Sequence, residues 1–212
     1  MDYLLDPLLE IYEYNKILDA IKNNFLPLNI TGPADSQKAH ISSAVCRHLE
    51  KRGLFVAFNE MQARRIYEDM SYFFAEDVLY FPSKEIILHD IEAKSNDAVY
   101  ERLEVISRLI EGKYRFIVTS AEAVSQKLMP KALYMENSMT LSVGSRVDIQ
   151  ELSRKLVMAG YERVSIVEGK GQFAVRGGII DIFSVDSEHA VRMELFDDEV
   201  DSLRSFDIMT QR

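Results

Sequence analysis

Apolar positions in the first part of the chain alternate between helical spacing and short unbroken runs. Recurrence every three to four residues predicts helices over 3–24, 37–52, 63–74 and 97–111. The unbroken runs predict buried strands at 54–58, 78–81 and 115–120. Strands that alternate with helices in this way are typical of a parallel sheet covered on both faces. The pattern therefore predicts an α/β domain over residues 1–127.

The pattern changes after Pro130, where strands become more frequent than helices. We expect a short strand within 141–147, a helix over 149–159, and a β-rich stretch over 161–183 that glycines interrupt. Two more strands are expected within 190–206, joined by a solvated turn around Asp197-Asp198-Glu199 rather than by a metal site. We interpret residues 128–212 as a second, α+β domain, with the boundary near 127–132.

Composition and charge narrow the class of protein and its partners. The 212 residues are 47% hydrophobic with 9 glycines and 5 prolines, which excludes collagen-like and wholly disordered chains. No apolar run is long enough to span a membrane, and the single cysteine, Cys46, fits a reducing, cytoplasmic compartment. No Cys/His cluster has metal-ligand spacing. The net charge of −9 disfavours general binding to nucleic acid, although residues 142–180 hold six basic against four acidic residues.

The most obvious place for catalysis is the strand-turn-helix pattern at 28–50, where an α/β nucleotide-binding domain would hold phosphate. The phosphate loop requires G-x-x-x-x-G-K-[ST]. Here Asn29 and Ala34 replace the two glycines, and Asp35 replaces the lysine. Ser36 keeps the hydroxyl and Gly32 lies within the loop, but a carboxylate at residue 35 repels the phosphates that the lysine would bind. We predict no catalytic residue, no nucleotide or other cofactor and no metal in this chain; the alternative is an ATPase in which Ser36 and other residues still hold Mg-ATP.

The most informative motif lies in the second domain. It consists of Gly160-Tyr161-Glu162-Arg163-Val164 followed by Gly171-Gln172-Phe173-Ala174-Val175-Arg176-Gly177-Gly178-Ile179-Ile180-Asp181-Ile182-Phe183. Its isoleucines supply core, whereas Arg163 and Arg176 stand at the ends of apolar stretches and could project from a sheet. An arginine beside an aromatic such as Phe183 is a common anchor at protein interfaces. Intradomain ion pairs, to Asp181 or Glu168, are the other possible role, and the residues alone leave both roles open.

This motif is part of a wider resemblance that covers essentially the whole chain. Together with Phe81-Pro82-Ser83-Lys84-Glu85, Tyr100-Glu101-Arg102-Leu103 and Phe196-Asp197-Asp198-Glu199-Val200-Asp201-Ser202-Leu203-Arg204-Ser205-Phe206-Asp207, it resembles the N-terminal UvrB-homology module of bacterial transcription-repair coupling factors (Mfd). The excision-repair helicase UvrB shares the module with its phosphate loop intact. The altered loop at residues 29–36 therefore favours the coupling factors.

The resemblance implies a degenerate helicase-like (RecA-like) parallel-sheet domain over 1–127 and a UvrB domain 2-like module over 128–212 that binds UvrA. Arg163 and Arg176 match the arginines of the family's interface, and Phe183 is the aromatic candidate. The resemblance further implies a longer parent, an ATP-dependent DNA translocase whose other domains bind ATP and Mg, RNA polymerase and DNA. We expect this chain to be a fragment without membrane contact that also touches the rest of the parent. A UvrB-like helicase fragment or a DNA-binding module using the basic stretch remains the alternative.

Overall fold

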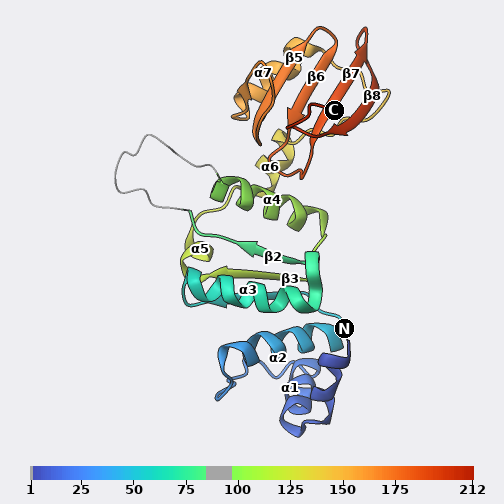
Figure 1. Ribbon diagram of the computed structural model, residues 1–212. Coiled ribbons are helices and arrows are strands. Elements are labelled where there is room, and N and C mark those ends of the chain that lie inside the picture. The colour runs from blue at the N-terminus through green and yellow to red at the C-terminus, as the bar shows by residue number, and fades with distance from the viewer. Residues whose placement is uncertain (1, 85–96) are drawn as a thin grey trace. The chain divides into compact units, whose positions relative to one another are not determined.

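The computed structural model describes residues 2–84 and 97–212, and the chain divides into two compact units (Figure 1). Unit 1 comprises Met1–Ala98 and Val105–Lys127, and unit 2 comprises Val99–Glu104 and Leu128–Arg212. Among the described residues, no helix combines the length and the apolar character that crossing a bilayer requires. Glu85, the last residue of the Phe81-Pro82-Ser83-Lys84-Glu85 motif, lies outside the described residues.

Unit 1 is built on a parallel three-stranded sheet in the order β1-β3-β2, as the alternation of strands and helices predicted. Its strands are β1 (Gly53–Ala57), β2 (Val78–Phe81) and β3 (Phe116–Ser120). Its helical elements are η1 (Asp2–Leu4), η2 (Asp6–Glu10), α1 (Tyr12–Lys22), α2 (Asp35–His48), α3 (Glu60–Phe74), η3 (Ala75–Asp77), α4 (Asp97–Glu111) and α5 (Ala121–Ser125); residues 99–104 of α4 are grouped with unit 2.

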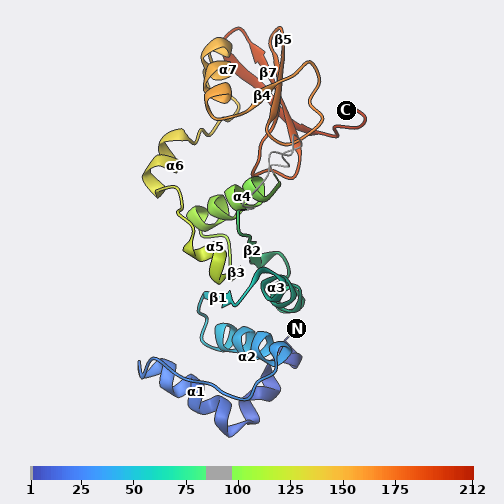
Figure 2. The same ribbon diagram turned by 90° about the vertical axis from the view of Figure 1, so that its left-hand side faces the viewer.

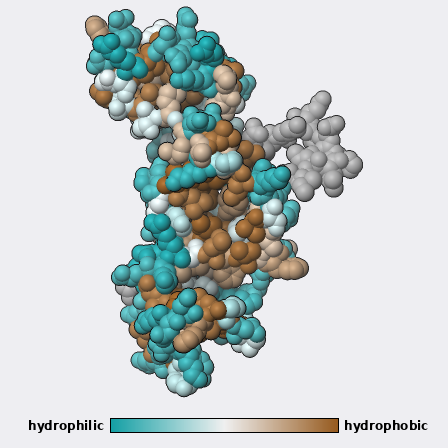
Figure 3. Space-filling view, turned by 180° about the vertical axis from the view of Figure 1, so that it is seen from behind, coloured by the Kyte–Doolittle hydropathy of each residue, from teal (hydrophilic) through white to brown (hydrophobic). Residues whose placement is uncertain are grey.

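Helices cover both faces of this sheet, but not completely. Helix α3 lies along one face (Figure 2). Its Ile66 and Met70 pack with Phe116 and Val118 of the central strand. On the other face, Val105 of α4 and Ala123 of α5 join a cluster with the apolar residues of β2. Leu54 and Val56 of the edge strand β1 stay exposed, at 58% and 46%. Figure 3 shows apolar side chains gathered on the surface of unit 1.

Glycine is required at one position of this sheet. Gly53 pairs with Phe116 across the β1–β3 ladder. The Phe116 ring lies over it, so that a Cβ built at residue 53 would stand 2.2 Å from a ring carbon. Phe116 is itself buried in the core, which leaves the ring little freedom to move aside. The close approach of the two strands therefore depends on the missing side chain.

Three expectations about local structure are wrong. The predicted helix over 3–24 is broken at Leu5 and Ile11 into η1, η2 and α1. Residues 25–34 form no strand before α2, because no described strand pairs with them and Pro27 lacks a backbone N–H. The strand expected within 141–147 is reduced to a single bridge between Arg146 and Glu199, since the chain turns at Gly144 with φ +86°.

Unit 2 is a five-stranded sheet in the order β4-β5-β6-β7-β8, in which β4 and β5 are parallel and the other neighbours are antiparallel. Its elements are α6 (Lys131–Asn137), α7 (Ile149–Met158), β4 (Glu162–Arg163), β5 (Gln172–Arg176), β6 (Ile179–Phe183), β7 (Ala190–Phe196) and β8 (Glu199–Phe206). The predicted solvated turn is confirmed: Asp197 and Asp198 are exposed and join β7 to β8.

The two faces of this second sheet differ in character. One face packs Phe173, Ile180, Met193 and Val200 against Leu152 and Leu156 of α7. Side chains alternate along each strand, so the neighbours of these residues point to the other face. That face holds a small apolar cluster around Ala174, Phe183 and Phe206 and, beside it, a group of charged side chains. We call it the arginine face.

Candidate functional site

Residues 29–36, for which the sequence predicted an altered phosphate loop, include the exposed start of α2. Ala34 stands at the N-cap, and its backbone N–H donates to Gln37 Oε1 at 2.8 Å. Asp35 follows in the first turn, where its Oδ1 accepts from Lys38 Nζ at 2.8 Å and its Oδ2 accepts from Gln62 Nε2 at 3.1 Å. The chain thus places its own carboxylate at the helix start, and the nearest lysine is bound to that carboxylate.

The charge at this helix start is stabilised as carboxylate. The hydrogen bond from Lys38 holds the pKa of Asp35 below its ordinary value, with a smaller contribution from Gln62. A negative charge in the first turn is also favoured by the helix dipole. Asn29, Gly32 and Ser36 are all exposed around it. An ionised carboxylate in the place of the phosphate-binding lysine disfavours a second anion, so these residues do not fit a triphosphate.

On the arginine face, two guanidinium groups share one buried carboxylate. Asp181, in the middle of β6, is 1% exposed. Arg192 of β7 donates to it from Nε at 2.6 Å and from Nη2 at 2.9 Å, while Arg176 at the end of β5 donates from Nη2 to Oδ2. The hydrogen bonds to Asp181 also raise the pKa of the Arg192 guanidinium. With two cations and one anion, the group keeps one net positive charge.

The two arginines are exposed to different degrees. The side chain of Arg192 is 17% exposed, whereas that of Arg176 is 46% exposed. Arg192 is also held by the Gln211 carbonyl, which accepts from Nη1 at 3.3 Å, and by the Phe206 ring, whose centroid lies 4.7 Å from the guanidinium carbon. Arg176 is therefore the member of the group that a partner could reach.

A second ion pair extends the charged group toward the far edge of the sheet. Arg204 of β8 donates to Glu194 of β7, and Ser202 donates to the same carboxylate. Arg204 lies directly opposite Arg192 in the β7–β8 ladder. Like charges facing each other across a ladder repel, so Glu194 compensates for a pairing that would otherwise be unfavourable.

The structure does not bring the two predicted interface arginines onto one face. Arg163 is exposed on the short edge strand β4, where it pairs with Phe173 of β5. Phe173 lies three residues from Arg176, so strand alternation directs the two arginines to opposite faces, about 10 Å apart along the strand. Among the described residues, Arg163 makes no ion pair, whereas Arg176 makes the pair to Asp181 that the sequence allowed.

Phe183, the third residue predicted for the interface, lies in the core of unit 2. Its side chain is 9% exposed and packs with Val167, Ala174, Ala190 and Phe206 beneath the arginine face. A ring in this position supports the sheet and offers little surface to a partner. The sequence motif could not reveal the burial of Phe183, because alternation along a strand is equally compatible with an aromatic that points into the core and with one that points to solvent. The contribution of Arg192 was missed, although a β6–β7 hairpin would have placed it opposite Asp181.

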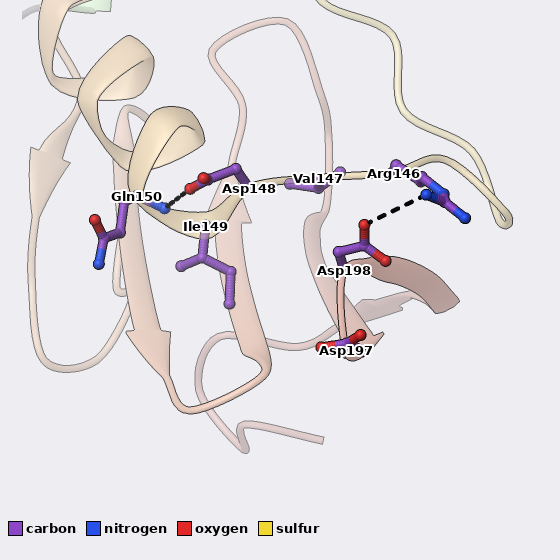
Figure 4. A pocket seen from close by; sticks show the side chains of 7 residues that line it. All are labelled: Arg146, Val147, Asp148, Ile149, Gln150, Asp197 and Asp198. Carbon is purple, nitrogen blue, oxygen red and sulfur yellow. Dashed lines mark hydrogen bonds and ion pairs between the residues drawn. The ribbon is translucent and has the colours of Figure 1, made fainter.

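An open pocket of about 540 Å³ lies elsewhere in unit 2, between the start of α7 and the β7–β8 turn (Figure 4). Three of its charged side chains already have partners. Asp148 accepts from the backbone N–H of Gln150 and Glu151, which caps α7, and Asp198 pairs with Arg146 at 3.8 Å. Within residues 2–84 and 97–212, no three Asp, Glu, His or Cys side chains converge as metal ligands would. The pocket therefore suggests no chemistry of its own.

Comparisons with a family model and with individual proteins agree with each other. Residues 139–212 match the family model of the UvrB interaction domain. The whole chain is 32% identical over 213 residues to the transcription-repair-coupling factor of Bacillus subtilis (strain 168), and 86% of it is 33% identical to that of Staphylococcus aureus (strain USA300). The matched regions are 18% and 16% of those proteins, so the chain spans less than a fifth of the relatives' length.

Proposed function

Because the chain is related along its length to part of the transcription-repair coupling factors and carries a UvrB interaction domain at residues 139–212, we propose that it recruits UvrA. Unit 2 would supply the docking surface, and unit 1 would be a scaffold without catalysis. In the parent protein this recruitment would bring excision repair to stalled transcription complexes.

The observation that carries the proposal is the arginine face. Arg176 projects from a rigid sheet, half exposed, in a group with one net positive charge. Charge-assisted hydrogen bonds from a guanidinium to carboxylates are among the stronger contacts at protein interfaces. Arg163 on β4 would contact UvrA from the sheet edge, and Phe183 would act from below by fixing the strand that carries Asp181.

The geometry of α2 supports the view that unit 1 does not use nucleotide. Asp35, at the position of the motif lysine, and Lys38 neutralise each other at the helix start. In the parent protein, ATP-dependent movement along DNA and displacement of RNA polymerase would reside in other parts of the chain. The uncovered apolar residues Leu54 and Val56 of β1 are the surface we assign to contact with those parts.

The experiment is titration of purified UvrA with the chain and its single variants by isothermal calorimetry. Arg176→Ala is expected to weaken binding by about 30-fold, equivalent to about 2 kcal/mol, if the arginine is a central anchor. Arg163→Ala is expected to weaken it as well, and the double variant more than either. The matched control is Arg154→Ala on α7, an exposed arginine outside the arginine face, which should leave the affinity unchanged.

Two results would contradict the proposal. Unchanged affinity of a folded Arg163→Ala/Arg176→Ala variant would remove the arginines from the interface. Saturable, Mg-dependent binding of a fluorescent ATP analogue would show that the start of α2 still holds nucleotide. Duplex DNA in place of UvrA is expected to give no binding even at low salt, since the chain carries a net charge of −9.

A further inference from the structure

We propose that Asp181 is a positioning residue: it holds Arg176 in the orientation that receives a carboxylate of the partner. This inference rests on the proposed function, because it concerns how the same arginine binds UvrA. Asp181 is directly opposite Ala174 of β5 and Arg192 of β7 in the two ladders. Arg176 lies two residues beyond Ala174, so the carboxylate is its diagonal neighbour, within reach of a long side chain.

Arg192 makes this arrangement possible. A carboxylate that is 1% exposed needs compensating charge and hydrogen bonds to remain ionised. Arg192 supplies two hydrogen bonds and is itself fixed by the Gln211 carbonyl and the Phe206 ring. Its donors are directed into unit 2. Arg192 thus binds both oxygens of Asp181, and Oδ2 also accepts from Nη2 of Arg176, which orients that side chain.

Arg176 makes fewer hydrogen bonds than Arg192. Only its Nη2 binds Asp181, and among the described residues its Nε and Nη1 make no hydrogen bond. The guanidinium is planar and rigid, so the hydrogen bond at one nitrogen restricts the directions in which the others can point. A long side chain that is already ordered loses less conformational freedom when a partner binds. The geometry thus favours an acidic side chain of the partner, bound by the remaining N–H donors of Arg176.

A double-mutant cycle in UvrA binding distinguishes positioning from a merely structural role. Asp181→Asn preserves the shape of the side chain and removes its charge. We expect it to weaken UvrA binding about tenfold when Arg176 is present, and less than twofold in the Arg176→Ala background. An equal loss in both backgrounds would overturn the proposal, because Asp181 would then act without Arg176. If Arg176→Ala alone left binding unchanged, the proposed function itself would fail.

A measurement on the unmodified chain keeps the proposal testable if Asp181→Asn does not fold. Nitrogen-15 relaxation of arginine Nε–H groups reports how ordered each side chain is before any partner is added. We expect a higher order parameter for Arg176 than for Arg163, which is exposed on the same sheet and lacks an ion pair among the described residues. Equal mobility of the two side chains would overturn the proposal.

Discussion

Each unit places cations beside a carboxylate, and the two groups differ in the burial of the carboxylate and in the number of cations. At the start of α2, one lysine, Lys38, pairs with one carboxylate, Asp35, and their side chains are 45% and 58% exposed. On the arginine face, one buried carboxylate is shared by two guanidinium groups. The first arrangement has no net charge. The second keeps a positive charge and a half-exposed donor.

This difference shows why the net charge of −9 does not decide what the chain binds. The local ratio of cations to carboxylates sets the sign of a surface, and burial of the carboxylate fixes the cation in place. At the start of α2 this ratio is one to one, and Asp35 stands where the phosphate-loop pattern has a lysine. Addition of Arg192 beneath Asp181 is enough to keep Arg176 available.

The largest expected effect concerns the sheet that supports the arginine face. Phe173→Ala removes a fully buried ring that packs under α7 and should lower the free energy of unfolding of unit 2 by about 3–5 kcal/mol. Phe116→Ala is the matched change in unit 1. Denaturant unfolding followed by circular dichroism measures both.

Cys46 distinguishes the two units in the same experiment. Burial raises the pKa of its thiol to about 11, so it should react slowly with iodoacetamide at neutral pH until unit 1 unfolds. We expect Phe116→Ala, and not Phe173→Ala, to expose Cys46 at lower denaturant. Earlier labelling of Cys46 in Phe173→Ala would show that the two units unfold together.

A smaller effect is expected when a cation is removed from each pair. Arg192→Ala leaves the buried Asp181 carboxylate with Arg176 alone and should cost about 2 kcal/mol of stability. Lys38→Ala breaks an exposed pair between residues one helical turn apart and should change stability by less than about 0.5 kcal/mol. Thermal or urea unfolding of the two variants tests this ranking, which equal losses would contradict.

The smallest effect is the pH dependence of the pair in unit 1. Because the pKa of Asp35 is lowered in the folded chain, its contribution to stability is present above the ordinary carboxyl pKa, about 3.9, and is lost as pH falls through the lower, folded value. Lys38→Ala should move the pKa of Asp35 up toward that ordinary value. Carboxyl carbon-13 NMR titration measures the shift. An unchanged titration curve would show that Lys38 does not hold the carboxylate.

Sequence periodicity predicted those elements that are long enough for a regular pattern of buried positions to be detected. Helix α4 begins and ends where the apolar spacing indicated, and so does β2. The five-residue α5 and seven-residue α6 were missed, because helices this short are not long enough to show a periodic pattern of apolar residues. The strand expected before α2 failed for a different reason: a strand needs a neighbour, and its apolar run gives no information about whether one is present.

The candidate site was predictable only in part. The motif identified Arg176, and Asp181 was considered as its ion-pair partner. That both lie in a group with Arg192 depends on the register of the β6–β7 hairpin, which residues 184–189 set and composition does not reveal. The separation of Arg163 and Arg176 onto opposite faces likewise follows from the parallel pairing of β4 with β5.

The Phe116 ring over Gly53 has a consequence for how freely the sequence of unit 1 can change. Even alanine at residue 53 would push its methyl group into an aromatic ring that is held by the core, and the edge strand would have to swing outward to make room. In a saturation library selected for folded chains, we expect residue 53 to return glycine almost alone. Leu54, one position along and exposed, should tolerate nearly every amino acid.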